Sequence, residues 1–561
     1  METRTPVHRI IPLQPVSEPH RDAPLDIDAE LARFEAEERR RLGLENPRRH
    51  WHDPLPRRFV AEQRARTTIL CGGLTLAHDR LIAGALSGLG YRIQNLDQPD
   101  NEALRLGKEF GNRGQCNPTY FTVGNLVKHL TWLRDGQGLS TREIVDNYLF
   151  ATGGGCGPCR FGMYITEYRK ALRDAGFDGF RVLLFQIEGG LRQATGDRPG
   201  LELNARFFMK LLQAIMLGDV LNLIGYRLRP YEVNAGATDA ALARCQDLIY
   251  AALQARRRLW PVLRQCRHTL ARIAIDRTRV KPKVAVIGEF WAMTTEGEGN
   301  YRLQRFLEQE GAEVDVQPVT NWLLYMIWWG RFVTRERREL RGSAAEPERT
   351  DTATRRHLAT LWLADKAARL VFGWTARLLG LRHYRLGDMD AVAAAAREHY
   401  NLNVEGGEGH MEVGKFILAA RLRKAVLVLS VKPFGCMPSS GVSDGVQSYV
   451  TERHPQTLFL PIETSGDGAV NVYSRVQMML FKAREAARRE IEQAEAETGL
   501  TAAQARKLAR RLPWLGRTLY QPRHSCKAST TAANFIYAAA RWRRRFPWLA
   551  IGASAATEPS G

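Results

Sequence analysis

The chain contains 561 residues, too many for one hydrophobic core, so we expect two or more domains. Its 44% hydrophobic and 25% charged residues are typical of soluble globular proteins, and no uninterrupted apolar run reaches the roughly 18 residues of a membrane span. The net charge of +21 would suit nucleic acid or another acidic partner, but an arginine-rich composition explains it more simply, and the sequence contains no nucleic-acid-binding motif, which disfavours nucleic acid.

The cysteines are widely spaced. There are eight: Cys71, Cys116, Cys156, Cys159, Cys245, Cys266, Cys436 and Cys526. The N-terminus carries charge throughout and lacks the apolar segment of a signal peptide, which predicts a cytoplasmic protein. Because such a chain rarely builds a disulfide framework, we expect metal binding or redox chemistry for some cysteines and inert packing for the others.

The first part of the chain predicts an arm followed by an α/β domain. Residues 1–66 form a proline-dotted arm with one charged helix, and the first α/β domain is expected over 67–277. This domain opens with strands at 67–73 and 90–96 separated by a helix, which is a βαβ unit. The glycine pair that ends the first of these strands, Gly72 and Gly73, lacks the spacing of a dinucleotide-binding fingerprint.

Two cysteine loops follow in this domain, each just ahead of a predicted helix. Cys116 lies in a polar, glycine-bearing loop before a helix over 123–133. Cys156 and Cys159 lie in the glycine-rich segment 151–164, which joins a strand to a helix. Glycine N–H groups can close around an anionic group there, and a helix N-terminus stabilises a thiolate. These loops are therefore candidate binding loops.

We predict structural roles for three other cysteines. Cys245 and Cys266 lie on predicted helices with mixed faces, and Cys71 ends a strand that is predicted to be buried. Residues in such positions are more often packed in a core than bound to a ligand.

The pattern changes near residue 278, where a second α/β domain begins. We expect it over 278–330 and 399–490, interrupted by a basic helical insertion at 331–398 and followed by a basic helical tail at 491–561. The insertion carries leucines and tryptophans among its basic residues. This composition favours packing on a neighbouring subunit or domain over contact with a membrane surface.

The second domain supplies the third cysteine loop. Cys436 lies in a Gly/Pro loop just beyond a buried strand at 424–430, as Cys159 follows the strand before it. The fold class is therefore α/β, with two Rossmann-like open parallel-sheet domains, a helical insertion and helical termini. Loops at the carboxyl ends of parallel strands are where such folds bind ligands.

Three interpretations of these loops compete. Cys156-Gly-Pro-Cys159 has the spacing of a thioredoxin-like dithiol, although three glycines precede it and the usual tryptophan is missing. A zinc site would need a second CxxC pair, and the chain has only one. The third is an iron–sulfur cluster held by Cys116, Cys159 and Cys436, with or without Cys156.

Several separated motifs resemble one family. Spread over about 67–490, they are Gln115-Cys-Asn-Pro118, Gly157-Pro-Cys-Arg-Phe-Gly162, Pro433-Phe-Gly-Cys-Met-Pro438, Gly288-Glu-Phe290, Glu296-Gly-Glu-Gly-Asn-Tyr301, Arg229-Pro-Tyr-Glu232 and Gly406-Gly-Glu-Gly409. Together they resemble the acyl-CoA dehydratase activase-related proteins, which are relatives of 2-hydroxyacyl-CoA dehydratase subunits and double-cubane cluster proteins.

The resemblance implies a 4Fe–4S or related cluster on Cys116, Cys159 and Cys436, with one iron left open and Cys156 as an additional candidate ligand. It implies low-potential electron transfer or reductive or dehydratase chemistry, which would make the chain a dehydratase or reductase component, a carrier or an accessory protein. The implied electron donor is an ATP-hydrolysing activator of actin-like fold, since the chain has no such module itself. A homologous subunit or a second copy of the chain is a further expected partner. The competing functions are a thioredoxin-like dithiol protein and a non-catalytic scaffold or nucleic-acid-binding protein.

Titratable residues in glycine-rich loops are candidates for proton transfer beside the cluster. We expect catalytic roles for Glu298, Glu408 and His410. Further acids in such loops are Glu289, Glu296 and Glu412. For any single one of them, loop solvation and helix capping are the competing roles.

Overall fold

A computed structural model of the chain describes residues 27–43, 59–155, 159–185, 199–341, 347–404, 408–441 and 445–546. The chain divides into two compact units, residues 1–55 and 56–561. In the first unit the described element is α1 (Ile27–Arg41), the charged helix predicted for the N-terminal arm. Both sheets and all the other helices belong to the second unit.

The first sheet has four parallel strands in the order β2-β1-β3-β4. They are β1 (Thr68–Cys71), β2 (Arg92–Asn95), β3 (Tyr148–Gly153) and β4 (Arg181–Phe185). The helices that connect them are α2 (Leu76–Ser87), α3 (Asn101–Phe110), α4 (Asn117–Thr131), α5 (Thr141–Asn147) and α6 (Tyr164–Asp174). β1, β3 and β4 are short, mainly apolar runs, whereas the edge strand β2 is polar and partly exposed.

The second sheet repeats this topology, with four parallel strands in the order β6-β5-β7-β8. They are β5 (Lys283–Gly288), β6 (Glu313–Val316), β7 (Leu427–Pro433) and β8 (Leu458–Thr464). Short helices follow β5, namely α10 (Phe290–Thr294), η5 (Glu298–Asn300) and α11 (Leu303–Gln309). The predicted α/β class with two Rossmann-like parallel sheets is confirmed.

In both sheets the strand order reverses between two central strands, β1 and β3 in the first and β5 and β7 in the second. Such a reversal is the topological switch point of a doubly wound sheet, and ligands bind in the crevice at its carboxyl end. The loops that follow these four strands are therefore candidate ligand-binding loops.

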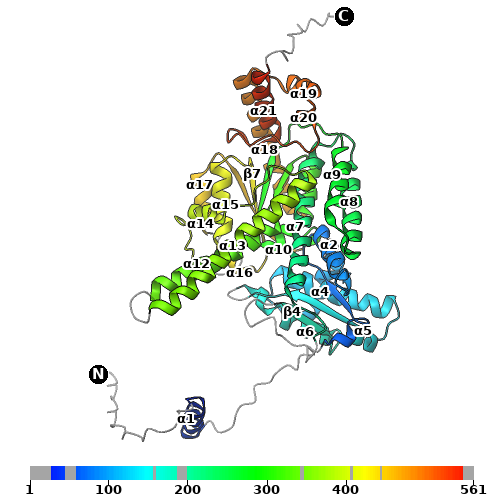
Figure 1. The fold of residues 1–561 in the computed structure, drawn as a ribbon, viewed down its shortest axis with the longest axis vertical. Coiled ribbons are helices and arrows are strands. Elements are labelled where there is room, and N and C mark those ends of the chain that lie inside the picture. Colours follow the sequence, from blue (N-terminus) through cyan, green and yellow to red (C-terminus); the bar gives the residue numbers. More distant parts are fainter. Residues whose placement is uncertain are drawn as a thin grey trace, which may run out of the picture. The chain divides into compact units, whose positions relative to one another are not determined.

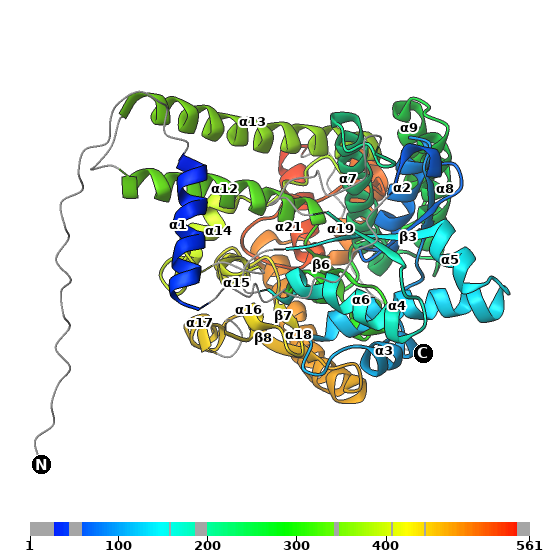
Figure 2. The same ribbon diagram turned by 90° about the horizontal axis from the view of Figure 1, so that it is seen from below.

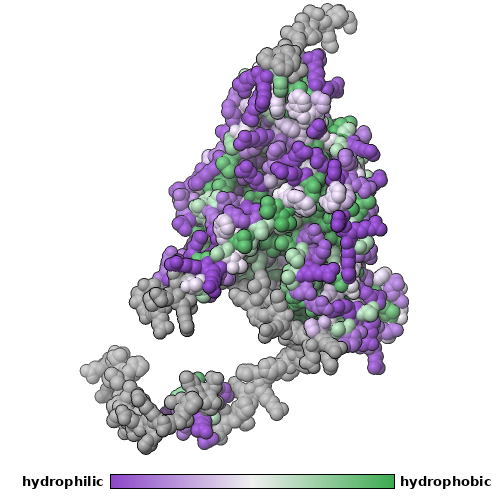
Figure 3. Space-filling view, viewed as in Figure 1, coloured by the Kyte–Doolittle hydropathy of each residue, from purple (hydrophilic) through white to green (hydrophobic). Residues whose placement is uncertain are grey.

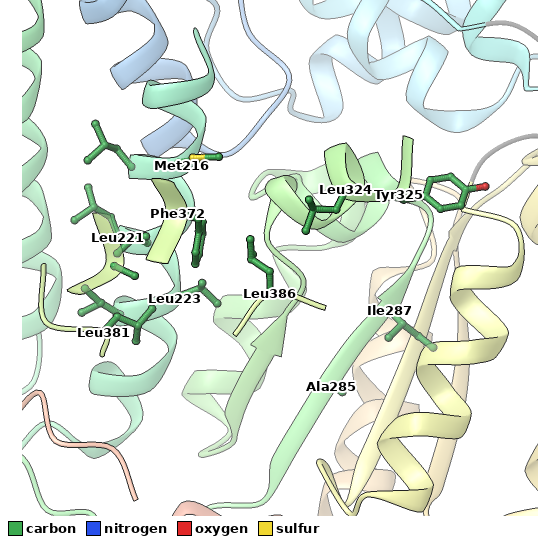
Figure 4. Packing of buried hydrophobic residues seen from close by; sticks show 14 of the residues in the cluster. Met216, Leu221, Leu223, Ala285, Ile287, Leu324, Tyr325, Phe372, Leu381 and Leu386 are labelled. Carbon is green, nitrogen blue, oxygen red and sulfur yellow. The ribbon is translucent and has the colours of Figure 1, made fainter. Parts of the chain in front are cut away.

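Long helices of both halves pack with the second sheet in one main core (Figure 1), and the strands of the first sheet lie in two further clusters. The helices with the largest share in the main core are α7 (Ala205–Leu228), α8 (Ala237–Gln254), α9 (Leu259–Ala271), α12 (Val319–Arg341), α13 (Pro347–Leu379), α14 (Met389–Ala396) and α15 (His410–Arg421). Figure 4 shows Met216 and Leu221 of α7, Ile287 of β5, Leu324 of α12 and Phe372 of α13 in this cluster. The core therefore crosses the predicted boundary near residue 278, and α12 starts before the predicted insertion.

Helix α7 is the one helix in the described part of the chain that is long and apolar enough to cross a membrane. The segment Ala205–Tyr231 has a mean hydropathy of 1.6, and 56% of its most apolar window is buried. A core helix with both sheets and several helices around it has the same composition, and α7 lies in such a place.

The tail forms a separate helical cluster that docks on the second sheet. It consists of α18 (Ala469–Thr498), α19 (Ala502–Arg511), α20 (Pro513–Gly516) and α21 (Thr531–Arg545). Two polar contacts fix it. Buried Arg277 donates to the carbonyl oxygens of Arg517 and Thr518, and the Glu313 carboxylate accepts from the Thr531 hydroxyl at 2.6 Å.

Candidate functional site

The three cysteines share one local geometry, since each stands immediately before a helix. Cys116 precedes α4, and Cys159 precedes η3 (Arg160–Met163), which runs into α6. Cys436 precedes α16 (Met437–Gly441), three residues after β7 ends. The first N–H groups of a helix have no partner within it, so this position can stabilise a negative charge on sulfur.

The Cys116 and Cys436 loops touch each other across the two sheets. The N–H of Asn117 donates to the carbonyl oxygen of Phe434 at 2.9 Å. Gly435 has φ +76° and lies so close that an added Cβ would sit 3.1 Å from the Cα of Cys116. Only a glycine adopts this conformation at little cost, and here it lets the two loops approach.

Cys159 joins them through electrostatics. Its thiol interacts with the thiol of Cys116 and with the carboxyl groups of Glu289 and Glu408, and the Cys436 thiol interacts with the same two carboxyl groups. Cys116, Cys159 and Cys436 therefore lie in one neighbourhood. Cys156 lies outside the described residues.

Each thiol has its own hydrogen-bond partners. The sulfur of Cys116 lies 3.1 Å from the Thr119 hydroxyl and 3.2 Å from the Tyr164 hydroxyl. The backbone N–H of Phe161 donates to Cys159, and the backbone N–H of Ser439 donates to Cys436. Donors of this kind fix the orientation of a metal ligand and tune the potential of a bound cluster.

Burial keeps two of these thiols protonated. It raises the pKa of Cys159 to about 12, with the negative charges of Glu289 and Glu408 adding to it and the Phe161 N–H acting against it. Burial, followed by the charge of Glu289, also raises the pKa of Cys436. A buried thiol of this kind loses its proton when a metal cation binds, because the cation supplies the missing compensation.

Buried ionisable groups surround the cysteines. Glu289 follows β5 and caps α10, accepting the Ala292 N–H at 2.8 Å. Burial raises the pKa of Glu289, of Glu408 and, to about 7, of Glu412. Lys415 is half-buried beside Glu408 and Glu412, and desolvation lowers its pKa to about 8. Cys436 is linked to this group through Ser439, whose hydroxyl donates to Glu412 at 2.8 Å.

Three polar atoms of this group have no hydrogen-bond partner, although their side chains are almost fully buried: one carboxyl oxygen each of Glu408 and Glu412, and Nε2 of His410. The His410 ring packs against Trp328 and Tyr325, with centroids 4.6 and 5.4 Å apart. Burial lowers the pKa of His410 to about 4, so this side chain is neutral near pH 7. Unpartnered buried polar atoms are costly and mark a place where a ligand or water is bound.

Glu298 and Glu296 occupy other positions. Glu298 accepts the N–H of Asn101 at 2.6 Å and pairs with Arg302, and Glu296 accepts the N–H of Leu76 at 2.7 Å. Both carboxylates cap helices of the first sheet and so join the two α/β layers. Within the described residues, no interaction links either carboxylate to the three cysteines.

The glycine pair after β1 is closed by a carboxyl group. Asp79 accepts the N–H groups of Gly73 and Leu74, both at 3.2 Å, so these donors are not available for a phosphate. Burial raises the pKa of Asp79 to about 6, with Glu296 adding to the rise.

The raised pKa of Asp79 predicts a pH dependence of stability. The unfolded chain loses this proton near pH 4 and the folded protein near pH 6, so the stability from this site is complete below pH 4 and lost as pH rises to 6. Two pKa units correspond to a loss of about 3 kcal/mol. Urea unfolding at a series of pH values should show this fall in the wild type and a flatter profile in Asp79→Asn. Parallel profiles would contradict the assignment.

Gly288, at the switch point of the second sheet, allows no side chain. It has φ +123°, and an added Cβ would lie 2.0 Å from the carbonyl oxygen of Val431. We expect Gly288→Ala to lower the free energy of unfolding by about 3 kcal/mol or more, because strain and overlap add. Gly373→Ala is the control, since no atom lies within 4 Å of its added Cβ. Equal melting temperatures for the two variants would contradict this reading.

The donor set fits an iron–sulfur cluster in its chemistry. Three thiols directly before helices, two of them on loops that follow strands, with hydrogen-bond donors on each sulfur, are groups that can hold such a cluster. No group of three or more His, Cys, Asp or Glu side chains in the described part of the chain stands in metal-binding geometry. The fit therefore rests on the convergence of the loops and on the orphaned polar atoms beside them.

Sequence analysis did not assign roles to Tyr164, Lys415 and Ser439. A helical spacing could have pointed to two of them, since Ser439 follows Cys436 by three residues and Lys415 follows Glu412 by three. Tyr164 reaches Cys116 from another helix, which a pattern in one segment does not reveal.

The remaining cysteines lie elsewhere. Cys245 and Cys266 are fully buried side by side in the main core, as predicted for structural residues. Cys71 hydrogen-bonds Asn95 on the neighbouring strand, and Cys526 is exposed.

Searches of protein-family models and of curated proteins found no match to this chain.

Proposed function

We propose that this protein binds a 4Fe–4S or related cluster through Cys116, Cys159 and Cys436 and takes part in low-potential electron transfer. The observation that carries the proposal is the meeting of three loops from two parallel sheets, each with a cysteine directly before a helix. A cluster bound there would accept and donate single electrons.

Three cysteine ligands would leave one iron open. A ligand at that position would be near three unpartnered polar groups. These are one carboxyl oxygen each of Glu408 and Glu412 and the neutral ring of His410. Their raised carboxyl pKa values keep protons available, which suits proton transfer to or from a bound group. Cys156 is a candidate fourth ligand.

The resemblance to 2-hydroxyacyl-CoA dehydratase relatives extends the proposal. It assigns the chain to reductive or dehydratase chemistry, as a component that receives its electrons from an ATP-hydrolysing activator of actin-like fold. A second copy of the chain or a homologous subunit would complete the assembly.

The thioredoxin-like alternative needs a reactive thiolate in the Cys156–Cys159 pair. The first cysteine of such a pair is the nucleophile, and Cys156 lies outside the described residues. Burial raises the pKa of Cys159, which suits the buried second cysteine of a dithiol as well as a cluster ligand.

Anaerobic purification tests the proposal. The protein should be brown and contain iron and acid-labile sulfide. With the activator, ATP and a strong reductant, its electron paramagnetic resonance signal should change only while ATP is hydrolysed. If the cluster is reduced at the same rate without ATP or activator, the proposed dependence on an activator is wrong. An iron-free protein with a redox-active Cys156–Cys159 disulfide would support the dithiol function. Tight, salt-dependent DNA binding by iron-free protein would support the non-catalytic scaffold or nucleic-acid-binding function.

A further inference from the structure

Helix α13 exposes an apolar stripe along its outer face. Leu363, Leu370 and Trp374 recur at intervals of seven and four residues and so lie on one side of the helix, with Leu370 75% exposed. Trp362 and Val371 are exposed at the edges of the stripe. Figure 3 shows apolar side chains gathered in the middle of this face, where α13 lies in Figure 1.

The opposite face of α13 already holds the helix in place. Phe372, Ala376 and Leu379 are buried in the main core, and α12 runs alongside (Figure 2). Arg369 pairs with Asp365 at 2.9 Å and donates to the carbonyl oxygen of Gly387. The exposed stripe is therefore presented on a rigid element and contributes nothing to this packing.

Positive charge borders the stripe. Between Thr352 and Gly387 the sequence has seven Lys or Arg residues and one acid, Asp365, which Arg369 neutralises. Exposed Arg356 and Arg377 continue the stripe at its two ends by the same seven-residue spacing. The Lys366 ammonium lies 5.7 Å from the centre of the Trp362 ring, so a positive charge stands directly beside an aromatic side chain at the edge of the stripe.

We propose that this face of α13 docks on the surface of an anionic lipid bilayer, with the helix lying in the membrane plane. Tryptophan and leucine side chains would enter the headgroup boundary while Arg356, Lys366 and Arg377 contact lipid phosphates. A straight stripe on a 33-residue helix, about 50 Å long, suits a flat surface. A second copy would bring the same basic face against itself, and like charges would oppose that pairing.

Co-sedimentation of the full-length protein with vesicles tests the proposal. We expect binding to phosphatidylcholine vesicles that contain about 30 mol% phosphatidylserine, none to phosphatidylcholine alone, and release in about 0.5 M salt. Leu370→Glu should weaken binding at least about tenfold, because it places a charge in the apolar stripe. The double variant Arg356→Glu and Arg377→Glu should weaken it by at least about tenfold as well.

Phe481→Glu is the matched control, since Phe481 is 64% exposed on α18 and should leave binding unchanged. Circular dichroism checks that all variants fold. Absence of binding to the anionic vesicles, or wild-type binding by Leu370→Glu, would overturn the proposal. A wild-type dimer that Leu370→Glu converts to a monomer, with no vesicle binding, would assign the stripe to a second copy and overturn it equally.

Discussion

Replacing Cys159 or Cys436 with alanine is expected to remove most of the iron and sulfide from anaerobically purified protein. Each substitution would delete one of the three proposed sulfur ligands, and a cluster left with two cysteines would be held too weakly to survive purification. The brown colour should fade with the metal. Iron and sulfide assays per mole of folded protein measure the effect.

Two other cysteines serve as controls for this experiment. Cys526 is exposed and Cys245 is buried in the main core, and neither has a part in the converging loops. Alanine at either position should leave the iron content at the wild-type level, while Cys245→Ala lowers the melting temperature slightly. Full iron content in Cys159→Ala would contradict the assignment of the ligands. Loss in all four variants would mean that folding, and not ligation, is being measured.

Asp219→Ala is expected to lower the free energy of unfolding by about 3–5 kcal/mol. The side chain is buried in α7, and its carboxylate accepts the N–H groups of Val319 and Thr320 at 2.7 and 2.8 Å and the Thr320 hydroxyl at 2.5 Å. His78 Nε2 lies 3.2 Å from the same carboxylate. The substitution leaves all of these groups unpartnered between α2, α7 and α12.

Asp388→Ala is the matched comparison, because Asp388 caps α14 with two N–H contacts at the surface. Its loss should cost about 1 kcal/mol, since water replaces the cap. Urea unfolding followed by circular dichroism measures both variants. A loss for Asp219→Ala no larger than that for Asp388→Ala would show that the buried network is not a main support of the core.

The strands were predictable because their signal is local. Short apolar runs between glycines and helical patterns mark β1, β3, β5 and β7, and the structure has a strand at each. The ends of the strands and helices were less predictable. β7 continues through Val431 to Pro433, where the sequence predicts a loop, because pairing with β8 extends to Thr464. Likewise, α12 begins at Val319, since core packing carries the helix ahead of the predicted insertion.

The cysteine loops were predictable from their place before helices and, for Cys159 and Cys436, after strands. Their contact was not, because Gly435 and Cys116 lie far apart in the sequence and meet only through the arrangement of two sheets. The buried surroundings of Glu408 and Glu412, which raise their pKa values, arise in the same way. A glycine-rich loop likewise suggested a site role for Glu298, whereas its carboxylate caps α3.

Mössbauer spectroscopy of protein grown on enriched iron tests the three-cysteine cluster most directly. We expect a spectrum in which one iron site differs from the other three, because Cys116, Cys159 and Cys436 would ligate three irons and leave the fourth to another ligand. The unique site should change when a small iron ligand is added, while the other three stay the same. Protein without iron, or with iron in a mononuclear tetrahedral thiolate site, would contradict the account.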